Sequence, residues 1–294
     1  MDMGRVFFYS PHPDDETLSM GLAMLHYIAN GFEVHLVSMT PGDAVGSGYF
    51  LNGQTPTGTP VVCPTPADHP WTHSPDREGY APLTTEAVGA ARLLEARSAL
   101  GIMAMVGPIP DTNGNPITPG PVVHHYGGLH DGFGNPASGS STADVTREGI
   151  DAAKAVMLPF ITDYPNSFHY TMSDADHHKD HKACGVALRE IKAENPTLLG
   201  GPRFFVSRLY WATSQPDGKY QQDLLDAANG TLAWFNAYGS RYTAYVDHLR
   251  NRVIKAYRAW APAAGAYGIG YHQVRSQFEA NFGVNASVAN LWHA

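Results

Sequence analysis

Two short stretches of the sequence crowd histidine and acidic side chains together. The first, SPHPDDET at residues 10–17, holds one histidine and three acids and directly follows the apolar run VFFY. The second, DADHHKDHKACGVAL at residues 174–188, holds three histidines and three aspartates. Acidic side chains repel one another, so each cluster needs a helix terminus, a proton or a cation nearby.

A divalent metal ion would satisfy both clusters at once. His12 and Asp15 lie where a predicted strand meets a predicted helix, which is the usual ligand position in an open α/β sheet. His178 and His181 would project from one face of a helix, because they are three residues apart. A set of two histidines and one aspartate suits zinc and leaves one position open, as catalytic zinc sites do. Asp14 would then lie beside that open position as a candidate general base.

The alternative is that both clusters only serve the helices that follow them. Acids in a first helical turn stabilise the helix dipole by about 0.3–1 kcal/mol each, and HHKDH alone is typical of a solvated polar tract. His12 and Pro13, however, are not needed for a helix cap. A metal is also the stronger aid to amide hydrolysis: lowering the pKa of water from about 15.7 to about 7 is worth roughly 12 kcal/mol, against about 3–5 kcal/mol for a general base. The two clusters together therefore favour a hydrolytic metal site.

The elements around these clusters predict an α/β fold. Arg5–Ser10 is predicted as a buried strand, residues 16–30 as a helix with Gly31 at its left-handed end, and Phe32–Thr40 as a second strand. This order forms a βαβ unit, so we expect a Rossmann-like, mostly parallel sheet flanked by helices. Further helices are predicted at TTEAVGAARLLEARSALG and TREGIDAAKAVMLPFI, and further strands at IMAMV, SFHYTMSD and Pro202–Thr213.

Two segments lack periodic signal and are rich in glycine and proline. They cover about residues 41–83 and 107–142, and we interpret them as long lid-like inserts, since long irregular loops in compact domains often bind ligands. Beyond a core at about residues 1–213, residues 214–294 are predicted to be mainly helical, with an apolar stripe along Tyr242–Trp260. We expect residues 1–294 to form a single domain.

The composition argues against several classes of partner. The chain has 27 acidic and 19 basic residues and a net charge of −8, without a block of lysine and arginine, which argues against nucleic acid or an anionic membrane. Its two cysteines cannot form a four-cysteine zinc site. No apolar run is long enough to span a bilayer, and the first residues lack the pattern of a secretion signal, so we expect a cytoplasmic protein. None of these features predicts the oligomeric state.

The motif PHPDDET and, far downstream, HKDHKA resemble those of the LmbE-like (PIG-L-type) zinc-dependent N-deacetylases, which carry an AHPDDE-type motif and an HxDH motif. The stretch ARLLEARSALG at residues 91–101 is similar to the Arg-x-x-Glu helix of that family. The resemblance covers roughly the first two hundred residues and implies a Rossmann-like fold and removal of an acyl group from nitrogen. Pro11 departs from the alanine usual in the family, but it concerns the backbone near the ligand and not the chemistry.

The resemblance implies a role for each candidate site residue. The implied ligands of one Zn²⁺ ion, with Fe²⁺ as the alternative metal, are His12, Asp15 and His181. Asp14 corresponds to the base that activates the metal-bound water. His178, in its protonated form, corresponds to the residue that stabilises the oxyanion, and Asp180 to the acid that supports His178.

The substrate is expected to be a small glycosylated molecule. Family members mostly act on N-acylglucosaminyl groups, and the overall layout resembles the deacetylases of teicoplanin-type glycopeptide antibiotic pathways, which implies a glycopeptide antibiotic precursor. The inserts suit a bulky aglycone because they are rich in aromatic residues, among them Tyr49, Phe50, Tyr80, Tyr126 and Phe133. Candidate substrate contacts are Arg92, Trp71, His124 and His125. Two alternatives stay open: a zinc amidase acting on a thiol conjugate or another non-sugar amide, and a non-catalytic sugar- or metal-binding protein.

Overall fold

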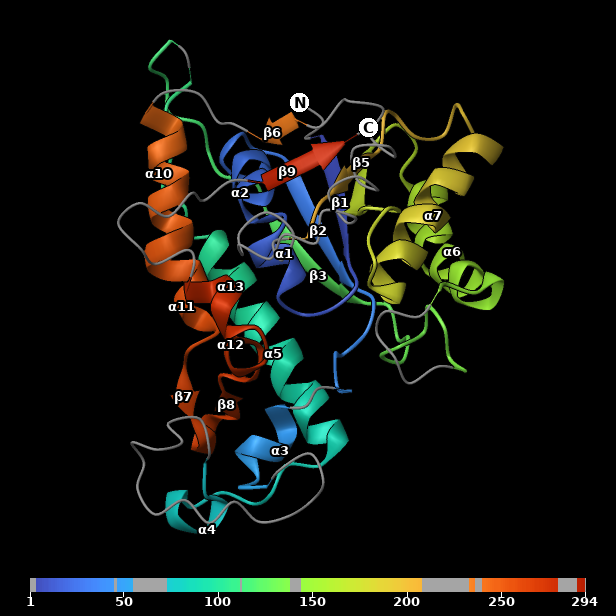
Figure 1. Ribbon diagram of the computed structural model, residues 1–294. Helices are drawn as coiled ribbons and strands as arrows, with labels where there is room; N and C mark the ends of the chain where they lie inside the picture. The colour runs from blue at the N-terminus through green and yellow to red at the C-terminus, as the bar shows by residue number, and fades with distance from the viewer. Residues whose placement is uncertain are drawn as a thin grey trace.

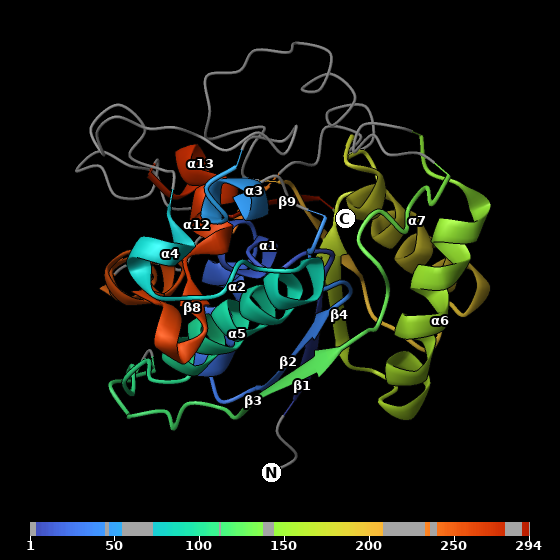
Figure 2. The ribbon, with the colours of Figure 1, turned by 90° about the horizontal axis from the view of Figure 1, so that it is seen from below.

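The computed structural model describes residues 4–44, 47–54, 73–111, 113–137, 144–207, 233–235, 240–279 and 290–293. These residues form a central sheet with helices against both faces (Figures 1 and 2). Within this part of the chain, no helix combines the length and the apolar composition needed to cross a membrane.

The central sheet has seven strands among the described residues, in the spatial order β3-β2-β1-β4-β5-β9-β6. The five strands from β3 to β5 are parallel, whereas β9 runs antiparallel to both β5 and β6. The prediction of a Rossmann-like, mostly parallel sheet is therefore confirmed. The strands are β1 (Arg5–Ser10), β2 (Glu33–Ser38), β3 (Val122–Tyr126), β4 (Phe168–Met172), β5 (Arg203–Phe205), β6 (Ala233–Phe235) and β9 (Asn290–His293).

The strand β1 is the central one of the five parallel strands, and its sequence explains this position. Val6, Phe7, Phe8 and Tyr9 are all fully buried, as expected for a parallel strand covered by helices on both faces. From β1 the chain builds β2 and β3 on one side, and it later adds β4 and β5 on the other side. The direction of building thus reverses between β1 and β4. At such a switch point the carboxyl ends of the strands border a crevice that commonly binds ligands.

One face of the sheet carries helices from the beginning, middle and end of the chain. Val6 and Phe8 of β1 point to this face and share one hydrophobic core with these helices. Gly31, predicted as the left-handed end of a helix, follows the helix at Gly21–Ala29 and has a φ of 80°, as such an end requires. The helices on this face are α1 (Asp15–Leu18), α2 (Gly21–Ala29), α5 (Thr85–Met103), α10 (Ser240–His248) and α11 (Ile254–Ala256).

The opposite face is covered by α6 (Arg147–Asp163) and α7 (Lys179–Glu194), which lie side by side in both views (Figures 1 and 2). Their apolar residues pack on Phe7 and Tyr9, the side chains of β1 that alternate with Val6 and Phe8. The α7 helix begins beside the carboxyl end of β4, so its first turn lies at the switch point of the sheet.

Three details differ from the sequence-based assignment. The helix predicted for residues 16–30 is divided into α1 and α2, with a break at Ser19 and Met20. The prediction of a strand at IMAMV is wrong, because α5 continues to Met103 and turns follow it. The next strand is β3, which lies inside the segment that we interpreted as the second insert. A short apolar run does not distinguish a strand from the end of a helix, which explains the error.

The C-terminal part contributes strands as well as helices. The apolar stripe predicted along Tyr242–Trp260 corresponds to α10, a π-helical turn (Leu249–Val253) and α11. Two strands from beyond residue 214, β6 and β9, extend the sheet. The remaining elements of the described residues are α3 (Ser47–Leu51) and α4 (Pro75–Glu78) of the first insert, the hairpin of β7 (Trp260–Ala261) and β8 (Ala266–Tyr267) with a 3-10 turn at Pro262–Ala264, α12 (Ile269–Gln273) and α13 (Arg275–Glu279).

Candidate metal centre

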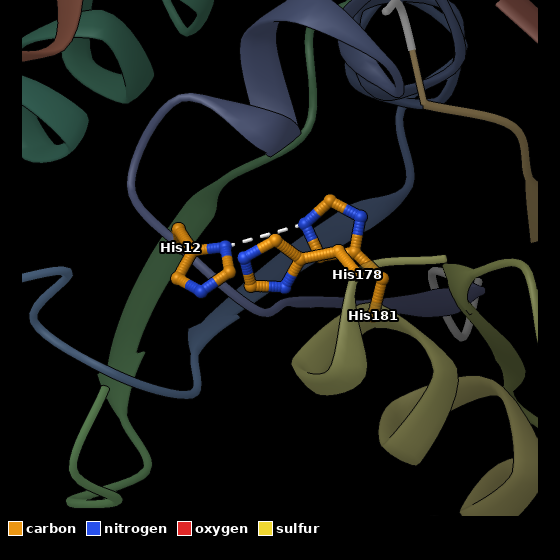
Figure 3. Close-up of side chains that lie close together, drawn as sticks. All are labelled: His12, His178 and His181. Carbon is orange, nitrogen blue, oxygen red and sulfur yellow. Dashed lines mark hydrogen bonds between the residues drawn. The ribbon is translucent and has the colours of Figure 1, made fainter. Parts of the chain in front are cut away.

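Three side chains that could bind a metal converge at the carboxyl ends of β1 and β4. His12 and Asp15 come from the turn after β1 and the start of α1, whereas His181 comes from the first turn of α7. Nδ1 of His12 lies 3.2 Å from Nε2 of His181, and Figure 3 shows these two rings meeting at that contact. Oδ2 of Asp15 lies 3.3 Å from Nδ1 of His12 and 3.1 Å from Nε2 of His181. Ligand atoms at about 2.0–2.1 Å from one tetrahedral zinc are about 3.3 Å apart, so this triangle has the size that zinc requires.

Two other groups of side chains share His12 and also bring ligand atoms close together. They are His12 with His178 and His181, and His12 with Asp131 and Asp180. The triangle with Asp15 explains the contacts better, because Asp131 and Asp180 approach Nε2 of His12 and leave Nδ1 facing the other two members of the triangle. His178 instead uses its Nδ1 atom to cap α7.

Both histidines of the triangle have a carboxylate against their second ring nitrogen. Nδ1 of His181 lies 2.9 Å from Oδ2 of Asp176. Nε2 of His12 lies 3.0 Å from Oδ2 of Asp180 and 3.2 Å from Oδ1 of Asp131. Histidines that bind metals usually donate their other N–H to a carboxylate, which fixes the ring and its tautomer. The chemistry of this donor set therefore fits a divalent ion held by two imidazoles and one carboxylate.

Asp180 is held in place by the second insert. Its Oδ1 accepts a hydrogen bond from the N–H of Gly134 at 2.7 Å, and its Oδ2 accepts one from Gly132 at 2.9 Å. A Cβ at Gly134 would lie 2.3 Å from the carbonyl oxygen of Lys179, so glycine there lets the insert approach α7 closely. Asp180 was expected to support His178, but its carboxylate contacts His12 and only its backbone N–H reaches His178.

Negative charge dominates this centre and changes the protonation of the two histidines. Burial alone would lower the pKa of His181, but Asp15 and Asp176 outweigh it and raise that pKa to about 10. Burial likewise opposes the charge on His12, yet its neighbouring carboxylates raise its pKa well above the ordinary value, Asp131 most strongly. The same carboxylates that favour positive charge on these rings would also stabilise a divalent cation at the triangle.

Asp14 lies beside the triangle and is held by a different partner. Its Oδ2 accepts a hydrogen bond from Nη2 of Arg92 at 2.8 Å, and Arg92 also donates to the carbonyl oxygens of Gly42 and Pro13. The backbone φ of Asp14 is 121°, a conformation that residues with a side chain rarely adopt. Burial raises the pKa of Asp14 to about 8, while the charge of Arg92 opposes this rise. A carboxyl group with a pKa near neutrality is suited to accept and return a proton.

His178 is the residue that precedes the first turn of α7. Its Nδ1 accepts a hydrogen bond from the backbone N–H of Asp180 at 3.3 Å, so the proton of the neutral ring lies on Nε2. Burial lowers the pKa of His178 to about 3, and the nearby His12 and His181 act in the same direction. This pKa disfavours the protonated His178 that the resemblance implied. The neutral ring still has one N–H to donate.

The structure does not bring the other predicted substrate contacts into this triangle. His124 and His125 lie on β3, where they hydrogen-bond side chains of β2 and α5. Arg92 is 2% exposed and donates to the turn that carries Asp14, so its contacts are internal to the protein. Trp71 lies outside the described residues.

The aromatic residues of the inserts have two different environments. Phe133 is 2% exposed and packs in the core between the sheet and the helices α6 and α7. Tyr49, Phe50 and Tyr126 are 43%, 39% and 48% exposed, so their rings remain available to a ligand. The predicted aromatic surface therefore consists of only some of the candidate residues.

Sequence reasoning missed two carboxylates of the centre. Asp176 precedes His178 by two residues within the second cluster, so the composition of that cluster was a usable signal. Asp131 lies in the glycine-rich second insert, where nothing periodic indicates which residues turn inward. Only the fold brings Asp131 to His12, through the same loop that binds Asp180.

Comparisons with known proteins place this centre in a family. A sequence profile described as PIG-L, GlcNAc-PI de-N-acetylase, matches residues 7–192, a range that contains the whole triangle and is more than half of the chain. The chain therefore belongs to the PIG-L family. The 1D-myo-inositol 2-acetamido-2-deoxy-alpha-D-glucopyranoside deacetylase of Mycolicibacterium vanbaalenii is 44% identical over 43 residues, which are 15% of this chain and 15% of the relative. The enzyme of the same name from Mycolicibacterium smegmatis is 44% identical over 48 residues, 15% of this chain and 17% of the relative. These matches span only a small part of each curated relative.

Solved structures share the fold over almost the whole chain. A deacetylase in complex with teicoplanin, from the teicoplanin biosynthesis pathway, has a TM-score of 0.55 and 13% identity, with 98% of this chain and 97% of the other covered. The A40926 pseudoaglycone deacetylase Dbv21 has a TM-score of 0.50 and 17% identity, with 99% and 97% covered. At these identities the likeness establishes the α/β fold.

Proposed function

We propose that this protein is a metal-dependent N-deacetylase that hydrolyses the acetamide of a glucosaminyl group on a larger scaffold, a glycopeptide antibiotic precursor. The observation that carries the proposal is the triangle of His12, Asp15 and His181 with Asp14 beside it. Membership of the PIG-L family supports the reaction. The acetylated glucosamine in the names of the curated relatives supports the sugar, and the teicoplanin-pathway deacetylase with the same fold supports the scaffold.

His12, Asp15 and His181 would hold a Zn²⁺ ion, with Fe²⁺ as the alternative. When bound, the ion would act as a Lewis acid toward the amide carbonyl and would lower the pKa of water. Asp176 and Asp180 support this role by accepting hydrogen bonds from the outer nitrogens of the two histidines, which keeps Nδ1 of His12 and Nε2 of His181 directed to one point. A three-residue set leaves a position for the reactants.

Asp14 moves the proton in this proposal. Arg92 occupies Oδ2 of Asp14, so Oδ1 is the oxygen that accepts a proton from the attacking water. The same oxygen then returns that proton to the nitrogen as the C–N bond breaks, which releases a free amine and acetic acid, the latter losing its proton to solvent as acetate. Arg92 keeps the carboxylate oriented throughout, because its guanidinium is also tied to two backbone carbonyls.

His178 stabilises the charge that develops on the amide oxygen. Its Nδ1 is occupied by the backbone N–H of Asp180, so the ring presents Nε2–H as its donor. A fixed N–H aimed at the oxyanion lowers the barrier without a cationic ring. This form of the proposal agrees with the lowered pKa of His178, because a cation nearby would lower that pKa further.

Metal content measured by plasma mass spectrometry on dialysed protein tests the centre. We expect about one zinc or iron per chain in the wild type, retention of the metal in His73→Ala and its loss in His181→Ala. His73 is a matched control because it is a histidine of the first insert that contacts Glu78 and His272. Absence of metal from the wild type even after zinc is added back would overturn the proposal and favour a non-catalytic binding protein.

Acetate release from a substrate panel then tests the reaction. The panel contains an N-acetylglucosaminyl glycopeptide, N-acetylglucosaminyl inositol and an N-acetylcysteine conjugate without a sugar. Release from the glycopeptide supports the proposed scaffold. Preference for the inositol compound would show that the scaffold is an inositol and not a glycopeptide. Release from the cysteine conjugate alone would favour the amidase alternative.

A further inference from the structure

A buried chain of hydrogen bonds joins the C-terminal part of the protein to Asp14. Tyr257, which follows α11, donates from its hydroxyl to Oε1 of Glu16, 241 residues away in sequence. The other carboxylate oxygen, Oε2, accepts a hydrogen bond from the backbone N–H of Asp14 at 2.8 Å. Tyr257 and Glu16 are both 0% exposed, and Asp14 is 5% exposed. Solvent therefore does not compete for these bonds.

Glu16 acts here as an acceptor that fixes the strained turn. Its Oε1 also accepts from Oγ1 of Thr17 at 2.8 Å, so three donors from three residues converge on one carboxylate. The unfavourable φ of Asp14 persists only if the surrounding structure determines it from several directions. Glu16 holds the backbone of Asp14, and Arg92 holds its carboxylate.

One turn of α5 holds the segment around Tyr257 at the same time. Glu95, three residues after Arg92, accepts from the backbone N–H groups of Ile269 at 2.6 Å and Gly270 at 2.9 Å. A Cβ at Gly270 would lie 2.8 Å from Cδ1 of Tyr257, so the absence of a side chain lets this segment pack against the tyrosine ring. The α5 helix thus fixes Asp14 through Arg92 and the surroundings of Tyr257 through Glu95.

We propose that Tyr257 is a positioning residue for Asp14, acting through Glu16 from the C-terminal part of the chain. The inference rests on the proposed function, in which Asp14 moves the proton. It gives α11, α12 and the segment between them a role in the reaction, although they contribute no side chain to the metal triangle.

Replacement of Tyr257 with Phe removes one hydroxyl and leaves the ring packing unchanged. We expect kcat to fall by about 10–100-fold, the loss typical of one hydrogen bond to a charged group, with KM unchanged within twofold and metal content unchanged. Tyr27→Phe is the matched control, because it removes a buried hydroxyl that lies 2.6 Å from the hydroxyl of Tyr170. This variant is expected to lose a similar amount of thermal stability and to keep its kcat. A kcat for Tyr257→Phe equal to that of Tyr27→Phe would overturn the proposal.

Combining Tyr257→Phe with Asp14→Asn tests whether Tyr257 acts through Asp14. If it does, Tyr257→Phe has little further effect on the residual activity of Asp14→Asn. A second loss of the same size as in the wild-type background would contradict the proposal.

Crystal structures of the wild type and of Tyr257→Phe give a readout that does not depend on turnover. We expect the variant to show Asp14 away from its positive φ and away from Arg92. An unchanged Asp14 would overturn the positioning role. A shifted Asp14 in the variant, together with a wild type that releases acetate from no substrate, would instead overturn the proposed function and support the positioning of Asp14 by Tyr257.

Discussion

Asp176 and Asp15 lie on opposite sides of the His181 ring, each against one of its nitrogens. Oδ2 of Asp176 is 2.9 Å from Nδ1, and Oδ2 of Asp15 is 3.1 Å from Nε2. Because Nδ1 is engaged, the lone pair of a neutral ring is on Nε2 and faces the triangle. Asp176, which is not itself a predicted ligand, thus leaves Nε2 as the nitrogen of His181 that would bind a metal.

Replacement of Asp176 with Asn should therefore weaken metal binding and leave the ligands in place. We expect the affinity for zinc to fall about 10–100-fold, as is typical when a carboxylate behind a ligand histidine is lost. Competition with a chromophoric chelator measures this change. Asp174→Asn is the matched control, since Asp174 lies two residues away and pairs with the partly exposed Arg189 at 2.6 Å. Equal affinities in both variants would show that Asp176 does not orient His181.

Asp14→Asn should separate chemistry from metal binding. Asparagine has nearly the same size as aspartate but cannot accept the proton, so we expect turnover to fall by about 10²–10⁴-fold. Metal content should stay at the wild-type level, because Asp14 is outside the triangle. Steady-state acetate release and metal analysis on the same preparation check both expectations. Full activity would show that another group is the base, and loss of the metal would show that Asp14 is a ligand.

Arg92→Lys should lower turnover more than it lowers metal content. Lysine keeps the charge but cannot bind Asp14 and the carbonyls of Gly42 and Pro13 in one planar arrangement, as Arg92 does. We expect kcat to fall about tenfold or more, in line with the loss of one charge-assisted hydrogen bond. Arg97→Lys on the exposed side of α5 is the control. Identical kcat values for the two variants would show that Arg92 does not orient Asp14.

The free energy of unfolding should decrease at acidic pH because of His169. This residue is 1% exposed, and burial, helped by the charge of His35, lowers its pKa to about 3. The unfolded chain binds a proton here below about pH 6.5 while the folded protein does not, so stability decreases as the pH falls from 6.5 toward 3.

Comparison with His169→Gln isolates this contribution. At pH 5.5 the wild type loses about 1.4 kcal/mol of unfolding free energy relative to pH 7.5 through this one group, and the variant does not. Urea denaturation of both proteins at the two pH values measures the difference. If the difference in unfolding free energy between the two proteins is the same at both pH values, the pKa of His169 is not lowered in the folded protein.

The sequence was sufficient for the elements that carry the site but not for the contacts that complete it. His12, Asp15 and His181 could be proposed because each lies next to a strong apolar signal, either the continuous apolar run of β1 or the apolar face of α7. Their partner Asp131 lies in a segment without periodicity, and its contact with His12 depends on how the glycine-rich loop folds back on α7.

The edge strand shows a similar limit for the fold. The sequence VVHHY of β3 is only partly buried, and it follows a proline- and glycine-rich stretch that reads as a loop. Its pairing with β2 comes from the backbone of a neighbouring strand rather than from its own pattern. The link between Tyr257 and Glu16 is of the same kind, because two residues so far apart in sequence share no local signal.

The triangle has a consequence for biogenesis, because its members enter the nascent chain at very different times. His12 and His181 are 169 residues apart, so a growing chain carries two of the three donors long before the third is synthesised. The proposed ion would then be captured only after β4 has paired with β1 and α7 has docked. An ion that binds only the folded arrangement stabilises the folded state relative to the unfolded chain and so favours completion of folding. Metal loading during synthesis would thus report that both halves of the parallel sheet have come together.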